Sequence, residues 1–516
     1  MKSATLSRPN FDSEGFENAF LAADFDRCRE LVSAGDDFDV ILPAARLALR
    51  ESRYLDIIGS LSDLSKLPEE MHVARHVLLG VALGLTRDYA GGQRFIERAI
   101  RDSSLDDPWH DEALYYKGVI AWMKQEYQEA EEAVASQLVA LDPNKRARSR
   151  ILLSWIALRR GQILRQVDEL QVALDDLDDA EMPDQYLRAN ALFTLALLCC
   201  ELPLHDVANR VRSIFGSLPW TSGLRLERFQ ITRFLAAIDE LNGNELAAFT
   251  GFKKAAPLAP SKHWSVICLL DRALLAKSTG EVAFATEQLH EAHEIAQRVS
   301  WNEVSGEERS ALLVLAQLFA HDDPAVAEQY LARYRTLSAS VTPILSYGTD
   351  PRVRGFEAYT QGVAWLGIGD VEVAKASLEE AWSIFEGFEY GWRAALCALA
   401  LYEVTHDQRW VEHAARKIEP WPKSWIARRV GQAPNTSVLR LDRVTPARRQ
   451  VLELVRSGMS NSEVANALGR SPNTVRNQVS ELFTTFNVKS RAELVASLSK
   501  PVAPVTMLDH KRRQKT

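Results

Sequence analysis

The apolar residues between residue 11 and about residue 430 recur at the three- and four-residue steps of amphipathic helices. Strand-like alternation is rare, and alanine, leucine, glutamate and arginine, which all favour helix, dominate this part of the chain. We therefore expect an all-α protein in which one helix follows another.

Three segments share one spacing of small residues. They are "GVAWLGIGDVEVAKASLEEA" (362–381), "ALLAKSTGEVAFATEQLHEA" (273–292) and "AAIDELNGNELAAFTGFKKAAPLAP" (236–260). Each has a small residue seven positions before a Gly, and alanines five and twelve positions after it. Small residues let two antiparallel helices approach, and Gly closes the turn between them. The pattern resembles the tetratricopeptide repeat (TPR), which implies a stack of helical hairpins.

Other copies of this repeat are weaker. The segment 118–143 keeps Gly118, Tyr127 and Ala130. The spacing drifts from about 29 to about 47 residues, against a standard period of about 34, so we expect roughly ten degenerate hairpins. Such a stack would form a curved α-solenoid with a concave groove for a protein, peptide or small-molecule effector. A generic helical domain with a chance resemblance is the alternative. The weaker copies centre on Cys28, Ile57, Gly92, Gln166, Ala208 and Ala327.

The pattern changes near "VGQAPNTSV" (430–438), where the helical period fails and Pro434 marks a connector. Short helices then follow, with legible starts and stops. Thr445 and Pro446 begin the first helix, and Gly458 ends it. Ser460 and Glu463 form a capping box for the second helix, which Gly469 ends. Ser471 and Pro472 begin the third helix, and Ser490 and Glu493 form a capping box for a fourth helix through Leu494 and Leu498.

The two helices joined by "GRS" predict a helix-turn-helix, whose second helix fits the major groove of DNA. Val475, Val479, Leu482 and Phe486 lie on one stripe of that helix, at steps of four, three and four. With this stripe buried, the polar side chains must face outward. Arginine pairs well with guanine and asparagine with adenine. The expected outward residues are Asn473, Arg476, Asn477, Ser480 and Thr484.

The stretch 443–499 resembles the LuxR-type (GerE-like) DNA-binding domain, a four-helix module, through "TPARRQVLELV", "GMSNSEVANALG", "SPNTVRNQVSELF" and "FNVKSRAELVA". The resemblance implies that the third helix is the recognition helix and that the fourth supports dimerisation. It implies groove contacts from Thr474, Arg476, Asn477 and Ser480, and phosphate contacts from Ser460, Asn461, Lys489 and Arg491.

Three residues depart from the pattern of that family. Arg448 and Gln450 stand where acidic residues are common, and Gln478 replaces a frequent histidine. Without an acid at Arg448, the first helix should lose about 1 kcal/mol of capping. The change at Gln478 could shift sequence preference. A sigma-factor-like region and a helix-turn-helix that docks a protein are rival interpretations.

The charge distribution favours DNA as a partner. Residues 438–516 hold 14 Lys/Arg and 6 Asp/Glu, a net of +8, and the remainder holds 47 and 63, a net of −16. A basic end on an acidic body suggests contact with a polyanion. The last residues, 501–516, carry Lys511, Arg512, Arg513 and Lys515, and we expect a disordered basic tail that adds non-specific affinity.

Nothing in the sequence indicates catalysis, a metal or a cofactor. The five cysteines lack zinc-site spacing, and an odd count is not a disulfide framework. His290 and His293 could share a helix face, but no third metal ligand has a recognisable spacing. No phosphate loop of the G-x-x-x-x-G-K-[ST] form is present. Without a signal peptide or a membrane span, we expect a cytoplasmic protein.

The sequence therefore predicts a bacterial transcription regulator that binds double-stranded DNA, as a possible homodimer. The expected domains are a TPR-like solenoid over 11–430, a linker over 431–441, a LuxR-type domain over 442–500 and the tail over 501–516. The alternative is a TPR scaffold whose helix-turn-helix end docks a protein partner.

Overall fold

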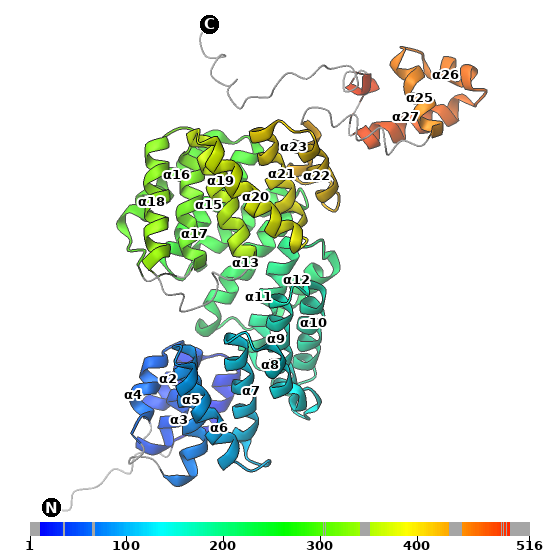
Figure 1. Cartoon of the computed structure of the whole chain (residues 1–516). Helices are drawn as coiled ribbons and strands as arrows, with labels where there is room; N and C mark the ends of the chain where they lie inside the picture. The colour runs from blue at the N-terminus through cyan, green and yellow to red at the C-terminus, as the bar shows by residue number, and fades with distance from the viewer. Residues whose placement is uncertain are drawn as a thin grey trace, which may run out of the picture. The chain divides into compact units, whose positions relative to one another are not determined.

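The computed structural model describes residues 11–34, 37–63, 68–302, 304, 306–340, 351–432, 446–486, 488, 490–491 and 493–495. Within these ranges all regular secondary structure is α-helix or 3-10 helix, and no β-strand occurs, as Figure 1 shows. The all-α prediction is confirmed. The chain divides into two compact units. The first unit contains α1 to α18, except for residues 240–243 and 319–327. These two short segments belong to the second unit, together with the chain from Gly355 onward.

The first unit begins with helices that pack in consecutive antiparallel pairs. Short 3-10 segments, η2 (Glu69–Met71), η3 (Ala135–Val139), η4 (Ser222–Leu224) and η5 (Ala256–Leu258), lie between some of them. The helices are α1 (Ser13–Leu21), α2 (Phe25–Ala34), α3 (Asp37–Arg50), α4 (Tyr54–Leu61), α5 (His72–Leu85), α6 (Tyr89–Asp102), α7 (Pro108–Met123), α8 (Tyr127–Val134), α9 (Pro143–Arg159), α10 (Ile163–Asp178), α11 (Gln185–Glu201), α12 (His205–Ser217), α13 (Arg225–Leu241), α14 (Glu245–Ala255), α15 (Lys262–Thr279), α16 (Val282–Arg298), α17 (Gly306–Phe319) and α18 (Pro324–Ser340).

The second unit is also built from helices and contains the C-terminal ones. The last helix before the expected linker ends at Gln432, so Gly431 and Gln432 are helical rather than part of the connector. Pro434 explains this end, because a residue that precedes proline disfavours the helical conformation. Residues 433–441 of the expected linker, and the tail, lie outside the described residues. The helices are α19 (Pro351–Ile368), α20 (Val371–Gly387), α21 (Gly391–Thr405), α22 (Arg409–Lys417), α23 (Trp425–Gln432), α25 (Pro446–Arg456), α26 (Asn461–Leu468) and α27 (Pro472–Phe486).

The repeat signature describes real hairpins. Gly243, Gly280 and Gly369 each lie in the turn between paired helices with a positive φ, where glycine is favoured. Apart from these turn glycines, the small residues of the three clean copies are all buried, as are the central residues of the six weaker copies. The chain is therefore an array of TPR-like helical hairpins.

The same turn also forms where the sequence has no glycine. In α1–α2, α5–α6 and α7–α8, the left-handed position is filled by Ala23, Arg87 and Gln125. The following residue still closes the turn through its backbone: the Glu126 N–H, for example, donates to the carbonyl of Ala121 at 2.9 Å, as the Glu281 N–H does to Ala276 at 2.8 Å. This is the C-terminal cap in which a left-handed residue satisfies the last carbonyls of a helix. Degenerate repeats thus keep the turn and lose only its glycine.

We expect Gly369→Ala to lower the stability of the α19–α20 hairpin by about 1–2 kcal/mol, because an L-residue with a side chain pays a steric cost in the left-handed region. An added Cβ at Gly369 meets nothing within 4 Å, so the effect is conformational rather than a clash. Gly387→Ala is the control: it also has open space and lies in helix α20, where alanine is favoured. Hydrogen exchange across 355–390 should show faster exchange for the first variant alone; equal protection in both would contradict this account.

The N-terminal hairpin packs against chain that lies far away in sequence. The Thr221 hydroxyl donates to the carbonyl of Ala23 at 2.6 Å, across 198 residues. Leu224 is buried in one apolar cluster with residues of α1 and α2. The Arg50 guanidinium pairs with Asp184 at 2.5 Å and lies over the Tyr186 ring at 4.5 Å. Helices α1, α3 and α11 therefore meet directly within the first unit.

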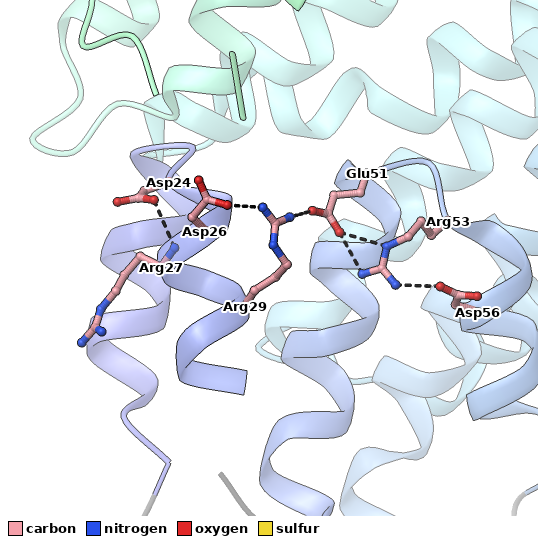
Figure 2. A network of polar contacts seen from close by, with 7 residues as sticks. All are labelled: Asp24, Asp26, Arg27, Arg29, Glu51, Arg53 and Asp56. Atoms are coloured by element: carbon pink, nitrogen blue, oxygen red, sulfur yellow. Dashed lines mark hydrogen bonds and ion pairs between the residues drawn. The ribbon is translucent and has the colours of Figure 1, made fainter. Parts of the chain in front are cut away.

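A surface chain of ion pairs supports the first two hairpins (Figure 2). Arg29 of α2 pairs with Asp26 and with Glu51, which follows α3. Arg53 pairs with Glu51 at 2.8 Å and with Asp56 of α4 at 2.6 Å. Single exposed pairs contribute little, but shared partners form a network that holds its geometry better. We assign this network a structural role.

Candidate nucleic-acid interface

Backbone capping sets the positions of the two helices of the helix-turn-helix. The predicted capping box is confirmed: the Ser460 N–H donates to Glu463 Oε2 at 2.7 Å, and the Glu463 N–H donates to Ser460 Oγ at 3.4 Å. These bonds to Ser460 lower the pKa of Glu463. Gly469 ends α26 at φ 62°, and the Thr474 N–H donates to Ser471 Oγ at 3.1 Å, which caps α27. The turn between the helices is therefore short and fixed at both ends.

The predicted apolar stripe of α27 is buried. Val475, Val479, Leu482 and Phe486 are at most 5% exposed. They pack against α25 and α26 in a core of their own, and that core fixes which face of α27 remains outside. The rest of the core is Val451, Leu452, Val455, Val464, Ala465 and Leu494.

The opposite face of α27 is polar and open. Arg476 Nη1 donates to Asn473 Oδ1 at 3.3 Å, an i, i+3 contact that orients the guanidinium along the helix. Because the core-facing stripe fixes the rotation of the helix, the polar side chains form one continuous exposed surface. All six predicted reading residues are exposed: Asn473, Thr474, Arg476, Asn477, Ser480 and Thr484.

The predicted phosphate contacts lie in less open surroundings. Asn461 accepts a hydrogen bond from Arg491 Nη1 at 3.1 Å, and Arg491 Nη2 also donates to the carbonyl of Met459. Arg491 therefore ties the start of the fourth helix to the turn between α25 and α26. Ser460 is exposed, although its Oγ serves the cap. Lys489 lies outside the described residues.

Only the beginning of the fourth helix is described. The Glu493 N–H donates to Ser490 Oγ at 3.2 Å, which is one of the two bonds of the predicted box. Leu494 is fully buried in the domain core, while Leu498 lies outside the described residues.

The three departures from the family pattern all take part in contacts that join α25, α27 and the turn before α27. Arg448 Nη2 pairs with Glu481 Oε2 at 2.5 Å, so the cation of α25 neutralises a carboxylate of α27. Arg470, in the turn, donates from Nη1 to Gln478 Oε1 at 3.0 Å and from Nη2 to Gln450 Oε1 at 3.5 Å. Sequence reasoning missed these three contacts, although it singled out Arg448, Gln450 and Gln478 as unusual. The signal that could have indicated these contacts was that Arg448, Gln450 and Gln478 all differ from the family pattern.

The described residues hold no other arrangement that competes as a site. None of the five cysteines forms a disulfide and all five are buried, and burial raises the pKa of Cys199 and Cys268 to about 12. His293 Nδ1 lies 2.9 Å from the Tyr330 hydroxyl, and no group of three metal-ligating side chains occurs in the described ranges. Nor does any described helix combine the length and apolar character of a membrane span.

Solved structures with similarity to this chain are helical proteins of low sequence identity. A Rap protein complexed with Competence and Sporulation Factor is 13% identical, with a TM-score of 0.44 over 71% of this chain and 99% of its own. The apo form of RapI is 12% identical, with a TM-score of 0.44 over 70% and 99%. Yeast Tom70 is 12% identical, with a TM-score of 0.33 over 89% and 97%.

A family match covers the C-terminal helices. No curated protein matches the chain. The model of the luxR family of bacterial regulatory proteins (GerE) matches residues 443–498, which span α25, α26 and α27 and the start of the fourth helix. Residues 443–498 of this chain therefore form a helix-turn-helix domain of the luxR family of bacterial regulatory proteins.

Proposed function

We propose that this protein is a DNA-binding transcriptional regulator whose helix α27 reads operator DNA in the major groove. The exposed polar face of α27, held by a separate apolar core, carries the proposal. The major groove admits one helix, and each base pair presents a distinct pattern of donors and acceptors there. The net charge of +8 over residues 438–516 adds attraction to phosphates.

The helical array supplies the regulatory input in this proposal. It senses a protein, peptide or small-molecule effector, and the effector changes the array or its self-association. A homodimer would place two C-terminal domains on two half-sites, whose separation must match the spacing of the domains. The effector acts only if it binds one arrangement better than the other.

The test is selection of duplexes from a random-sequence library by the full chain. We expect a recurrent site to be enriched, and affinity for it to fall steeply as salt rises, because protein cations replace counterions on the phosphates. A duplex of the same composition in scrambled order is the control. No enriched site, together with stable co-purification of a protein partner, would favour the scaffold alternative instead.

A further inference from the structure

Helix α27 carries a single acidic side chain, at the edge of its open polar face. Its sequence, PNTVRNQVSELFTTF, contains one acid, Glu481, and one base, Arg476. Glu481 follows Asn477 by four positions and Thr474 by seven, so these three side chains lie along one side of the helix. All three are exposed. A carboxylate therefore borders the surface that meets DNA in the proposed function.

This carboxylate has a cation beside it that comes from another helix. Arg448 Nη2 of α25 lies 2.5 Å from Glu481 Oε2 of α27. The two side chains remain 35% and 51% exposed, so the pair forms at the surface of the domain, where water screens it. An exposed ion pair of this kind adds little to stability. Its main effect is on the charge that the side of α27 presents to a ligand.

The position of each charge is unfavourable without the other. Helix α25 begins at Pro446, so Arg448 lies in its first turn. The N-terminus of a helix has a partial positive charge, and a second cation there is repelled. Glu481 alone would be unfavourable for a different reason, because a carboxylate repels the phosphates of DNA. Each charge of the pair therefore offsets a penalty that the other would carry alone.

We propose that Arg448 masks the charge of Glu481 and thereby lets the side of α27 that carries Thr474 and Asn477 approach the phosphate backbone of DNA. The inference rests on the proposed function. A helix that enters the major groove has phosphates close to its flanks. An unpaired carboxylate on such a flank would be repelled, whereas the ion pair has no net charge. Arg448 acts through Glu481, so it is a positioning residue.

The experiment is a double-mutant cycle of Arg448→Gln and Glu481→Gln in the full chain, with the enriched duplex and its scrambled control, in about 0.1 M salt. We expect Arg448→Gln alone to weaken binding of both duplexes by roughly three- to tenfold, because it leaves an unpaired carboxylate near the phosphates. Glu481→Gln alone should strengthen binding by about twofold or more, because Arg448 can then attract phosphates. The double variant has the net charge of the wild type and should bind within about twofold of it.

Two further variants separate this role from folding and from net charge. Arg448→Lys keeps the cation and should bind within about twofold of the wild type. Glu453→Gln also removes one acid, but from the exposed side of α25 opposite the buried Val451 and Val455, and should change affinity by less than about twofold. Hydrogen exchange over 451–486 should be the same in every variant, because an exposed pair adds little to stability.

The decisive quantity is the difference between the effects of Arg448→Gln in the presence and in the absence of Glu481. Equal losses in the two backgrounds would overturn the proposal, because Arg448 would then contribute only its own charge. Lost protection in both single variants would also overturn it and make the pair a structural clasp. If Arg448→Gln alone unfolds the domain, Glu481→Gln decides: tighter binding supports masking, and unchanged or weaker binding contradicts it. A wild-type chain that binds no duplex would instead refute the proposed function itself.

Discussion

Phe486→Ala is expected to unfold the C-terminal domain while the hairpin array stays folded. The Phe486 side chain is completely buried at the end of α27, in a core that belongs to this domain. Truncating a buried phenylalanine costs about 3–5 kcal/mol. A domain of fewer than about 70 residues rarely has more than 3–5 kcal/mol of stability from its core, so the loss should exhaust it.

Hydrogen exchange of the full-length variant would show this result directly. Peptides over 451–482 should lose their protection, while peptides over α5 and α6 keep theirs, and affinity for DNA should disappear. Thr484→Ala is the control for folding, because Thr484 is exposed on the same helix. Retained protection over 451–482 in the Phe486 variant would show that the core does not depend on this ring.

Arg476→Ala is expected to leave the domain folded and to weaken recognition of the enriched site by roughly 5- to 150-fold, which corresponds to 1–3 kcal/mol. Arg476 is exposed, and its contact with Asn473 orients the guanidinium before DNA arrives. An arginine that bonds both guanine acceptors distinguishes that base from the other three. Preference should therefore relax at one position of the site and persist at the others.

Repeating the library selection with the variant measures this effect. Arg456→Ala serves as the matched change, since it removes the same side chain from an exposed position on α25. If Arg476→Ala selected the same site with undiminished preference at every position, Arg476 would have no part in base recognition.

Short-range patterns in the sequence predicted most of the C-terminal domain. The steps of four, three and four between Val475, Val479, Leu482 and Phe486 specify one buried stripe because helical periodicity is a local property. The capping box of Ser460 and Glu463 is also local, since its two bonds join residues three apart. Which face of α27 is exposed follows from the buried stripe, and where α26 begins follows from the capping box.

Contacts between distant residues could not be predicted in the same way. Arg470 reaches Gln450 across 20 positions and Arg448 reaches Glu481 across the whole helix-turn-helix, and neither spacing has a periodic signature. The missing acid at Arg448 suggested only a weaker cap, whereas the structure gives this side chain a partner, Glu481, on α27. The turns at Ala23, Arg87 and Gln125 were not predicted, because the left-handed backbone conformation there is adopted by residues other than glycine.

The contact between Ala23 and Thr221 changes how the first unit should respond to stress. In an open array each hairpin touches only its neighbours, and the terminal hairpin can fray at little cost. Here the terminal hairpin is also anchored to η4 and α11, so its detachment would uncover apolar surface at both places. The α1–α2 hairpin and the segment around Thr221, 198 positions after Ala23, should therefore melt together as one cooperative block.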